Sequence, residues 1–252
     1  MVRQRQRFTR PAPDEDFANP LAVVDGVGWL GGDIRGQRLL CLAAGGGKHS
    51  ALYAAAGAEV TVIDISPAML ELDRQVAAER KLCVRTIEAS MDDMPALATG
   101  EFDIVIHPVS TCYVPAIGPV YQEVARVTRA GGLYISQHKT PASLQADVAP
   151  TPRGYELVEP YYRDGPLPSV VGSSHREEGT LEYLHRWEEL LGLMCRAGFV
   201  IEDLLEPQHA KEGAEPGSFG HRGRFVAPYV RIKARRTGMA AGNVVTKTIW
   251  QP

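Results

Sequence analysis

Residues 38–66 constrain the fold more than any other part of the chain. An apolar run over residues 39–43 predicts a buried strand, which breaks into three successive glycines at 45–47. Residues 48–56 are typical of a helix, and the β-branched run 60–65 predicts a second strand that carries an acid near its end. The stretch therefore predicts a strand–turn–helix–strand unit.

Three features of this unit suit a cofactor that contains a nucleoside. Gly45 and Gly47 lie in the first turn, where the lack of a Cβ lets a ligand approach the backbone closely. The start of the following helix presents free N–H groups to an anion. Asp64 lies 17 residues beyond Gly47, at the tip of the second strand, where a carboxylate can hold the two hydroxyls of a ribose.

The spacing of the glycines separates two classes of cofactor. The dinucleotide fingerprint G-x-G-x-x-G requires a third glycine, but His49 lies where it is sought. The stretch instead resembles the first motif of class I S-adenosylmethionine-dependent methyltransferases, which reads L-D-x-G-x-G-x-G with an acid on the next strand. Gly45 and Gly47 match two glycines of that motif, whereas Ala43 stands at its first glycine and Cys41 at its acid.

Three later phrases resemble further motifs of the same superfamily, in the same order. They are FDIVIHPVSTCYV at 102–114, VARVTRAGGLYIS at 124–136 and LLGLMCRAGFVIEDL at 190–204. The resemblance runs over residues 38–205 and is to the small-molecule methyltransferases of the kind found in ubiquinone and menaquinone biosynthesis. It implies a Rossmann-like α/β fold with a doubly wound, mostly parallel seven-stranded sheet, which the alternation of predicted strands and helices independently favours.

The resemblance also implies a binding site for S-adenosyl-L-methionine, with S-adenosyl-L-homocysteine as the product. The turn glycines approach the methionine part, Asp64 holds the ribose, and Ile65 packs on the adenine face. Ser90 falls at the position of the acid that accepts from the adenine amino group, with Asp92 as the alternative. The expected cofactor-binding residues are Ala43, Gly45, Gly47, Asp64, Ile65, Ser90, Met91, Asp92 and His107.

The catalytic residues stay open, with three candidates. His107 ends the predicted fourth strand, and ligands of open α/β sheets lie outside the carboxyl ends of the strands. It can contact the cofactor or the substrate, or act as a general base. Tyr113 and His138 are expected near the same edge. A general base is needed only if the methyl acceptor is a hydroxyl or a protonated amine.

The rest of the chain reads as one methyltransferase domain, residues 1–252, with three appended segments. Residues 1–20 predict a loose arm, 140–180 a lid-like insertion rich in proline, glycine and tyrosine, and 238–252 a tail. Ser66 and Pro67 predict the start of a helix over 67–81. The other expected elements are strands at 82–89, 104–106, 133–138, 199–205 and 224–233, the last at an edge or bulge because of Pro228, and helices at 121–128 and 184–197.

Composition excludes several other classes of protein. The net charge of −3 argues against a nucleic-acid binder. The four cysteines form no C-x-x-C pair, so no metal site is expected. No stretch of 18 apolar residues predicts a membrane span, and the start of the chain does not resemble a signal peptide, which favours a cytoplasmic protein.

Two alternatives to a methyltransferase that acts on a small-molecule acceptor stay open. An NAD(P)-dependent oxidoreductase would use the same fold, although the glycine spacing disfavours it. A non-catalytic protein that binds S-adenosylmethionine or S-adenosylhomocysteine is suggested by the departures at Cys41, Ala43 and Ser90. The acceptor, the methylated atom (O, N, C or S), the pathway and the oligomeric state do not follow from the sequence.

Overall fold

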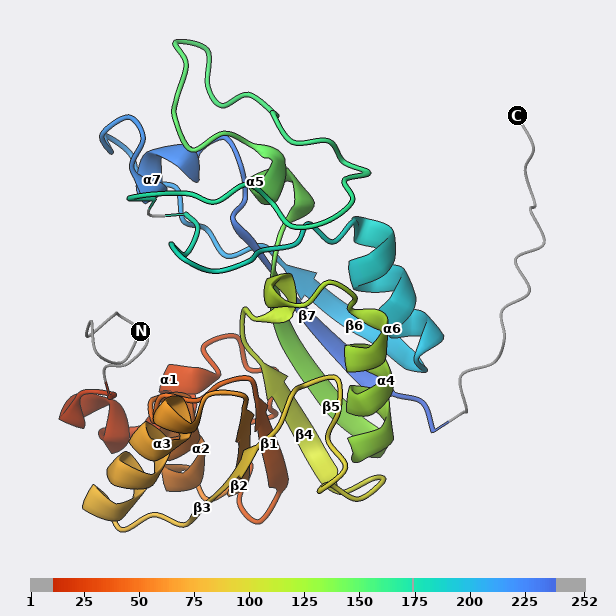
Figure 1. Cartoon of the computed structure of the whole chain (residues 1–252). Helices are drawn as coiled ribbons and strands as arrows, with labels where there is room; N and C mark the ends of the chain where they lie inside the picture. Colours follow the sequence, from red (N-terminus) through yellow and green to blue (C-terminus); the bar gives the residue numbers. More distant parts are fainter. Residues whose placement is uncertain (1–10, 174, 239–252) are drawn as a thin grey trace.

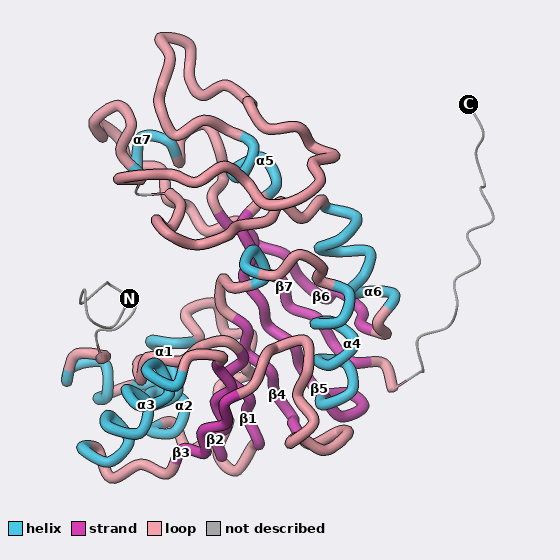
Figure 2. The backbone as a smooth tube through the Cα atoms, viewed as in Figure 1, coloured by secondary structure: helices cyan, strands magenta, loops and turns pink. Residues whose placement is uncertain are grey.

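A computed structural model of the chain describes residues 11–173 and 175–238 and shows a seven-stranded sheet (Figures 1 and 2). The strand order is β3-β2-β1-β4-β5-β7-β6, and only β7 runs antiparallel to its neighbours. This confirms the predicted doubly wound, mostly parallel sheet. The strands are β1 (Arg38–Leu42), β2 (Glu59–Asp64), β3 (Val84–Glu88), β4 (Phe102–His107), β5 (Thr128–Lys139), β6 (Phe199–Leu205) and β7 (Tyr229–Arg236).

Helices cover both faces of the sheet (Figure 1). Successive residues of β1 point to opposite faces, so Leu39 and Cys41 enter one hydrophobic cluster and Leu40 and Leu42 enter the other. Because all four are fully buried, β1 reads as a continuous apolar run, as expected for a central parallel strand. One face is covered by α1 (Pro20–Val24), α2 (His49–Ala55) and α3 (Pro67–Glu79), and the other by α4 (Gly118–Val127) and α6 (Leu193–Arg196).

The direction in which the chain crosses the sheet reverses between β1 and β4. From β1 the chain adds β2 and β3 on one side, then returns to add β4 and β5 on the other. The register pairs Leu39 with Ile104 and Cys41 with Ile106, so the turn after β1 and the end of β4 meet at one edge. Ligands of doubly wound sheets bind at such a switch point, outside the carboxyl ends of the strands.

Helix α3 begins as predicted. The hydroxyl of Ser66 accepts a hydrogen bond from the backbone N–H of Met69, and Pro67 occupies the first helical position. These features fix the start of α3 directly after β2, so the helix packs beside the turn that carries the three glycines.

The predicted place of one strand and the predicted starts of two other elements are wrong. Strand β7 lies inside the sheet between β5 and β6, because Pro228 precedes the strand and does not interrupt its hydrogen bonds. Strand β5 already begins at Thr128 instead of at the predicted residue 133, so Gly131 and Gly132 lie within the strand. The helix expected at 184–197 begins later, as a π-helical turn (Glu188–Gly192) that continues into α6.

Two segments far apart in the sequence form a separate layer beyond the carboxyl end of β5, which we call the cap (Figures 1 and 2). The cap comprises residues 140–187, with α5 (Pro141–Gln145), and residues 206–228, with α7 (Phe219–Arg222). The guanidinium of Arg222 is buried and donates to the backbone oxygens of Ser143 and Ala146, each at 2.8 Å. The sequence predicted an insertion at 140–180 but not the second segment.

The described part of the N-terminal arm packs against α3. A short 3-10 helix covers Asp14–Ala18, where the Asp14 carboxylate forms an ion pair with Arg80. The guanidinium of Arg80 also lies 3.7 Å from the centre of the Phe17 ring. Within the described part of the predicted arm, Asp14 and Phe17 thus contact the residue that follows α3. Residues 1–10 and 239–252, which include almost all of the predicted tail, lie outside the described residues.

Candidate functional site

Asp64 is fixed at the carboxyl end of β2 by two backbone donors. Its Oδ2 accepts from the N–H of Gly45 and its Oδ1 from the N–H of Ser66, each at 2.9 Å. An ionised carboxylate offers about four lone-pair sites, so about two are left for further donors. The side chain is only half-buried, so part of it is accessible to solvent.

The turn after β1 needs glycine for two reasons. A Cβ on Gly45 would lie 2.7 Å from the Cβ of Met69 and 2.8 Å from Oδ2 of Asp64, which is closer than real contacts allow. Gly47 has a φ of +76°, in the left-handed region that favours glycine. Ala43 also has a positive φ, +48°, and so occupies a backbone conformation that costs a side-chain-bearing residue about 1–2 kcal/mol.

The N–H groups of Gly46 and Gly47 in this turn are not free for an anion, because a buried acid accepts from both. Asp73 of α3 accepts from the N–H of Gly46 at 2.9 Å, from the N–H of Gly47 at 3.1 Å and from the hydroxyl of Ser50. Burial raises the pKa of Asp73, and these three donors act against that rise. The sequence analysis missed Asp73. The available signal was an acid three residues after Leu70, on the apolar face of α3.

The predicted adenine side of the site lies at the ends of β2 and β3. Asp64 pairs in register with Glu88, so Ile65 and residues 90–92 follow neighbouring strands to the same edge. The side chain of Ile65 is 72% exposed. The hydroxyl of Ser90 donates to the carboxylate of Asp92, and Met91 is buried between them.

His107 ends β4 as predicted, but both of its ring nitrogens have partners within the protein. Nδ1 lies 2.8 Å from the hydroxyl of Tyr134, and Nε2 lies 2.7 Å from the hydroxyl of Ser110. Burial lowers the pKa of His107 to about 3, so the ring is neutral near pH 7. Ser110 also approaches the sulfur of Met91 at 3.8 Å, which links the end of β4 to the predicted adenine side.

The other two catalytic candidates lie near His107. The rings of His107 and His138 have centroids 6.3 Å apart. His138 contacts the hydroxyls of Thr111 and Ser136 through its two nitrogens, and burial lowers its pKa well below the usual value. The hydroxyl of Tyr113 donates to a carboxylate oxygen of Glu177 at 2.9 Å, and burial raises the pKa of Tyr113. None of the three candidates titrates near neutral pH.

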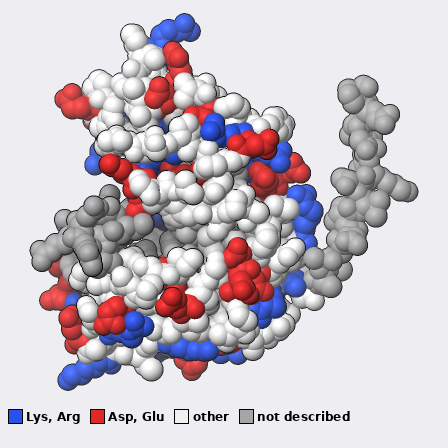
Figure 3. All heavy atoms as spheres, viewed as in Figure 1, with Lys and Arg blue, Asp and Glu red and all other residues white. Residues whose placement is uncertain are grey.

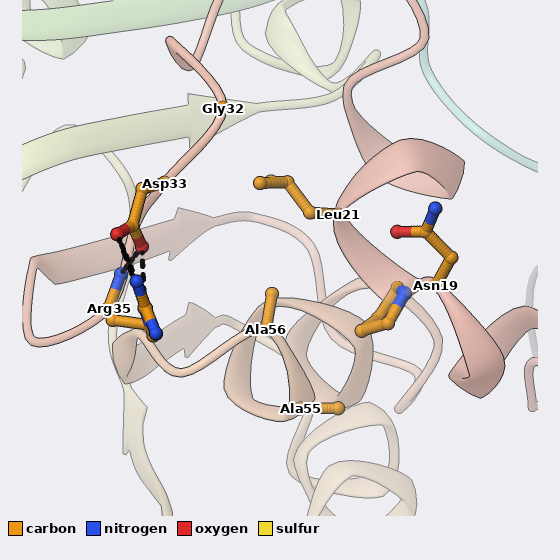
Figure 4. Close-up of a pocket in the computed structure, with 8 residues that line it drawn as sticks. Asn19, Leu21, Gly32, Asp33, Arg35, Ala55 and Ala56 are labelled. Atoms are coloured by element: carbon orange, nitrogen blue, oxygen red, sulfur yellow. Dashed lines mark hydrogen bonds and ion pairs between the residues drawn. The ribbon is translucent and has the colours of Figure 1, made fainter.

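A surface cavity of about 270 Å³ lies elsewhere, at the amino end of β1 (Figure 4). Its wall includes Leu21, Asp33 and Ala56, and Asp33 pairs there with Arg35. Because ligands of parallel sheets bind at the carboxyl ends of the strands, this cavity is not the predicted cofactor site.

Within residues 11–173 and 175–238, no group of three or more His, Cys, Asp or Glu side chains is placed to hold a metal ion. No helix of these residues has the length and apolar character needed to cross a membrane. On the face in Figure 3, acidic and basic side chains are interspersed, so this face offers no continuous basic surface to a polyanion.

Comparison with known proteins now identifies the class. A family model described as a methyltransferase domain matches residues 40–136, which span β1 to the middle of β5. The chain is 34% identical over 177 residues to the uncharacterized methyltransferase YbaJ of Bacillus subtilis, covering 69% of each chain. With the sheet order and the glycine turn, this shows that the chain belongs to the class I S-adenosylmethionine-dependent methyltransferases.

Two more comparisons agree with this assignment. A ubiquinone biosynthesis O-methyltransferase of Xanthomonas oryzae is 34% identical over 113 residues, which cover 44% of this chain and 47% of that one. An S-adenosylmethionine-dependent methyltransferase from Mesorhizobium loti has the same fold, with a TM-score of 0.66 at 21% identity over 81% of this chain and 93% of that one. The first relative matches less than half of this chain, and the second shares the arrangement of the elements.

Proposed function

We propose that this methyltransferase transfers the methyl group of S-adenosylmethionine to a small-molecule acceptor, with the cofactor lying across the turn after β1. The observation that carries this proposal is the geometry of Asp64. Its two oxygens are oriented by Gly45 and Ser66, and their remaining lone pairs are aligned to accept from a ribose diol. The lack of a Cβ at Gly45 lets the turn lie close to this carboxylate and to α3.

We assign the adenine to the space between Ile65 and residues 90–92. The exposed Ile65 would lose its contact with water under a flat ring, which is a favourable change. Ser90 replaces the usual acid, but its hydroxyl holds the carboxylate of Asp92 beside it. Asp92 therefore supplies the oxygen that accepts from the adenine amino group, and Ser90 orients it.

The end of β4 forms the wall near the methionine part of the cofactor. The sulfonium supplies the reactive methyl group when the cofactor is bound. His107 is neutral and engaged at both nitrogens, so we assign it the role of holding Ser110 and Tyr134 in place instead of taking a proton. The contribution of the protein is then alignment of the acceptor with the methyl group, which can lower a barrier by about 7–11 kcal/mol.

The cap is proposed as the lid over the acceptor. Residues 140–180 leave β5 at its carboxyl end, on the side of the sheet where the cofactor turn lies. If they act as a lid, protection of their backbone amides from hydrogen exchange should rise when cofactor and acceptor are both bound. If the backbone amides of this segment are equally protected with and without the two ligands, the segment is a surface loop and not a lid.

The glycine turn argues against a nicotinamide dinucleotide. In dinucleotide-binding folds, the N–H groups of this turn receive a pyrophosphate. Here Asp73 occupies those of Gly46 and Gly47, and its carboxylate would repel a second anion at the same place. S-adenosylmethionine has no phosphate and therefore does not need these two N–H groups for a pyrophosphate.

Calorimetry with S-adenosylhomocysteine and with NAD tests the proposal. S-adenosylhomocysteine should bind and raise the melting temperature, because a ligand selective for the folded state stabilises it, whereas NAD should do neither. Heat with NAD alone would refute the cofactor assignment. Formation of S-adenosylhomocysteine from S-adenosylmethionine in the presence of an acceptor would then separate a catalyst from a non-catalytic binder.

A further inference from the structure

Glu177 of the cap has an incomplete set of hydrogen bonds. Its Oε2 accepts from the hydroxyl of Tyr113 at 2.9 Å. Its Oε1 is shielded from solvent and has no hydrogen-bond partner among residues 11–173 and 175–238. Buried polar atoms of folded proteins are nearly always paired, so this oxygen requires an explanation.

Another acidic residue of the cap, Glu182, has partners for both of its carboxylate oxygens, unlike Glu177. Glu182 is fully buried, and its two oxygens form ion pairs with Lys139 and Arg176. Glu177 instead meets a neutral hydroxyl. Lys139 and Arg176, the latter next to Glu177 in the sequence, thus both pair with Glu182.

The carboxylate of Glu177 contacts the loop that follows β4, through the hydroxyl of Tyr113. Its partner, Tyr113, belongs to a short 3-10 helix (Thr111–Tyr113). Two further contacts join the cap to this helix. The N–H of Tyr183 donates to the backbone oxygen of Cys112 at 2.7 Å. The ring of His185 lies 2.9 Å from the backbone oxygen of Thr111.

The same loop also touches the proposed cofactor site. One residue before the 3-10 helix, the hydroxyl of Ser110 contacts both His107 and the sulfur of Met91. Glu177 therefore lies at the junction of the cap with the carboxyl end of β4, which is the side of the sheet where an acceptor must meet the cofactor.

We propose that Glu177 is the recognition residue for the methyl acceptor, and that the acceptor carries a positively charged nitrogen, such as an ammonium group. Such a group donates to the unpaired Oε1 and neutralises a charge that only a hydroxyl now contacts. Tyr113 is a positioning residue that orients the carboxylate. This proposal rests on the proposed function, because it assigns the acceptor for that same site, and it leaves open which atom of the acceptor is methylated.

The test uses probes in place of the unknown acceptor. Primary amines and the alcohols of the same shape, for example benzylamine and benzyl alcohol or butylamine and butanol, are titrated by calorimetry into the full chain saturated with S-adenosylhomocysteine at pH 7. At this pH the amines are charged and the alcohols are not. At least one amine should bind ten-fold or more tightly than its alcohol, since only the amine offers a charged donor.

Variants connect this preference to Glu177. Glu177→Gln keeps the size of the side chain but removes its charge, and it should reduce the amine affinity at least ten-fold. Glu156→Gln is the control, because Glu156 is an exposed acid of the same cap and its loss should change nothing. If Glu177→Gln fails to fold, Glu177→Asp withdraws the carboxylate by one methylene and should weaken amine binding at least three-fold.

Two results overturn the assignment. In the first, every amine binds no more tightly than its alcohol. In the second, amine binding survives in Glu177→Gln or, where that variant does not fold, in Glu177→Asp. The affinity for S-adenosylhomocysteine separates this failure from failure of the proposed function: it should stay within two-fold of wild type in every folded variant, whereas its absence from the wild-type protein would refute the cofactor site itself.

Discussion

The cofactor half of the molecule and the cap are built in different ways. Around the glycine turn, two carboxylates, Asp64 and Asp73, accept from backbone N–H groups of Gly45, Gly46 and Gly47. Strands β1 and β2 and helices α2 and α3, all regular elements, set that geometry. In the described part of the cap, the helices are the short α5 and α7, and the remaining described residues are irregular.

The cap compensates for its lack of regular structure with buried charged side chains. Glu182 and its partner Lys139 are 43 positions apart in the sequence, and Arg222 reaches Ser143 over 79 positions. In the cofactor half, strands and helices set the backbone that the two carboxylates bind, whereas the irregular backbone of the cap is held by a few buried ionic groups. This difference predicts that substitution of a buried ionic residue in the cap lowers the free energy of unfolding more than the substitutions considered below for the cofactor half.

The largest effect is expected from Glu182→Gln in the cap. This change leaves Lys139 and Arg176 buried without their common counter-charge. Breaking a buried ion pair by removing one partner typically costs about 3–5 kcal/mol. Urea unfolding measures the loss, and hydrogen exchange should place it in residues 140–187.

The exposed Glu156 provides the matched control, since Glu156→Gln should change the free energy of unfolding by less than about 0.5 kcal/mol. Equal stability of the two variants would mean that the ion pairs of Glu182 do not hold the cap.

A smaller loss of stability is expected when the pH is lowered, because of His107 at the boundary between the two regions. The pKa of His107 is about 3 in the folded protein and about 6.5 when unfolded. Between these values the unfolded chain binds a proton that the folded chain does not, so stability falls as the pH drops below 6.5. This histidine should contribute a loss of about 2 kcal/mol between pH 6.5 and pH 5.

Unfolding in urea at several pH values, with wild type and His107→Gln side by side, isolates this contribution. The stability of His107→Gln should fall less steeply between pH 6.5 and pH 5, because the glutamine does not titrate. Parallel slopes for the two proteins would contradict the buried, neutral state of His107.

The smallest effect is expected in the cofactor half, from Ala43→Gly. Ala43 has a φ of +48°, which glycine adopts without strain, so the variant should be as stable as wild type or more stable by up to about 1 kcal/mol. Ala54→Gly, in helix α2, should instead destabilise by about 0.5–1 kcal/mol. A loss in Ala43→Gly as large as in Ala54→Gly would show that the turn does not depend on this conformation.

Much of the fold could be predicted from the sequence where local rules govern it. Local structure follows directly from the apolar run of β1, the glycines at 45–47 and Ser66, the N-terminal capping residue of α3. The sheet order follows the family pattern. Strand β7 was placed wrongly at an edge because Pro228 is near it in sequence. The pairing of β7 with both β5 and β6 is a property of the whole sheet.

The site could be predicted only in part, for the same reason. Asp64 and the turn glycines follow a local motif and lie together as predicted. Asp73, Glu177 and Arg222 act through partners far away in the sequence, and no spacing rule connects a buried ion or an unpaired oxygen to its neighbours.

The affinity of Asp64→Ala for S-adenosylhomocysteine, measured by calorimetry, tests the central claim that Asp64 holds the cofactor. Loss of hydrogen bonds to a charged group should cost about 1.5–3 kcal/mol, or about 10- to 150-fold in the dissociation constant. Glu59→Ala, at the opposite and exposed end of β2, should bind as wild type does. A folded Asp64→Ala protein with an unchanged dissociation constant would contradict the account.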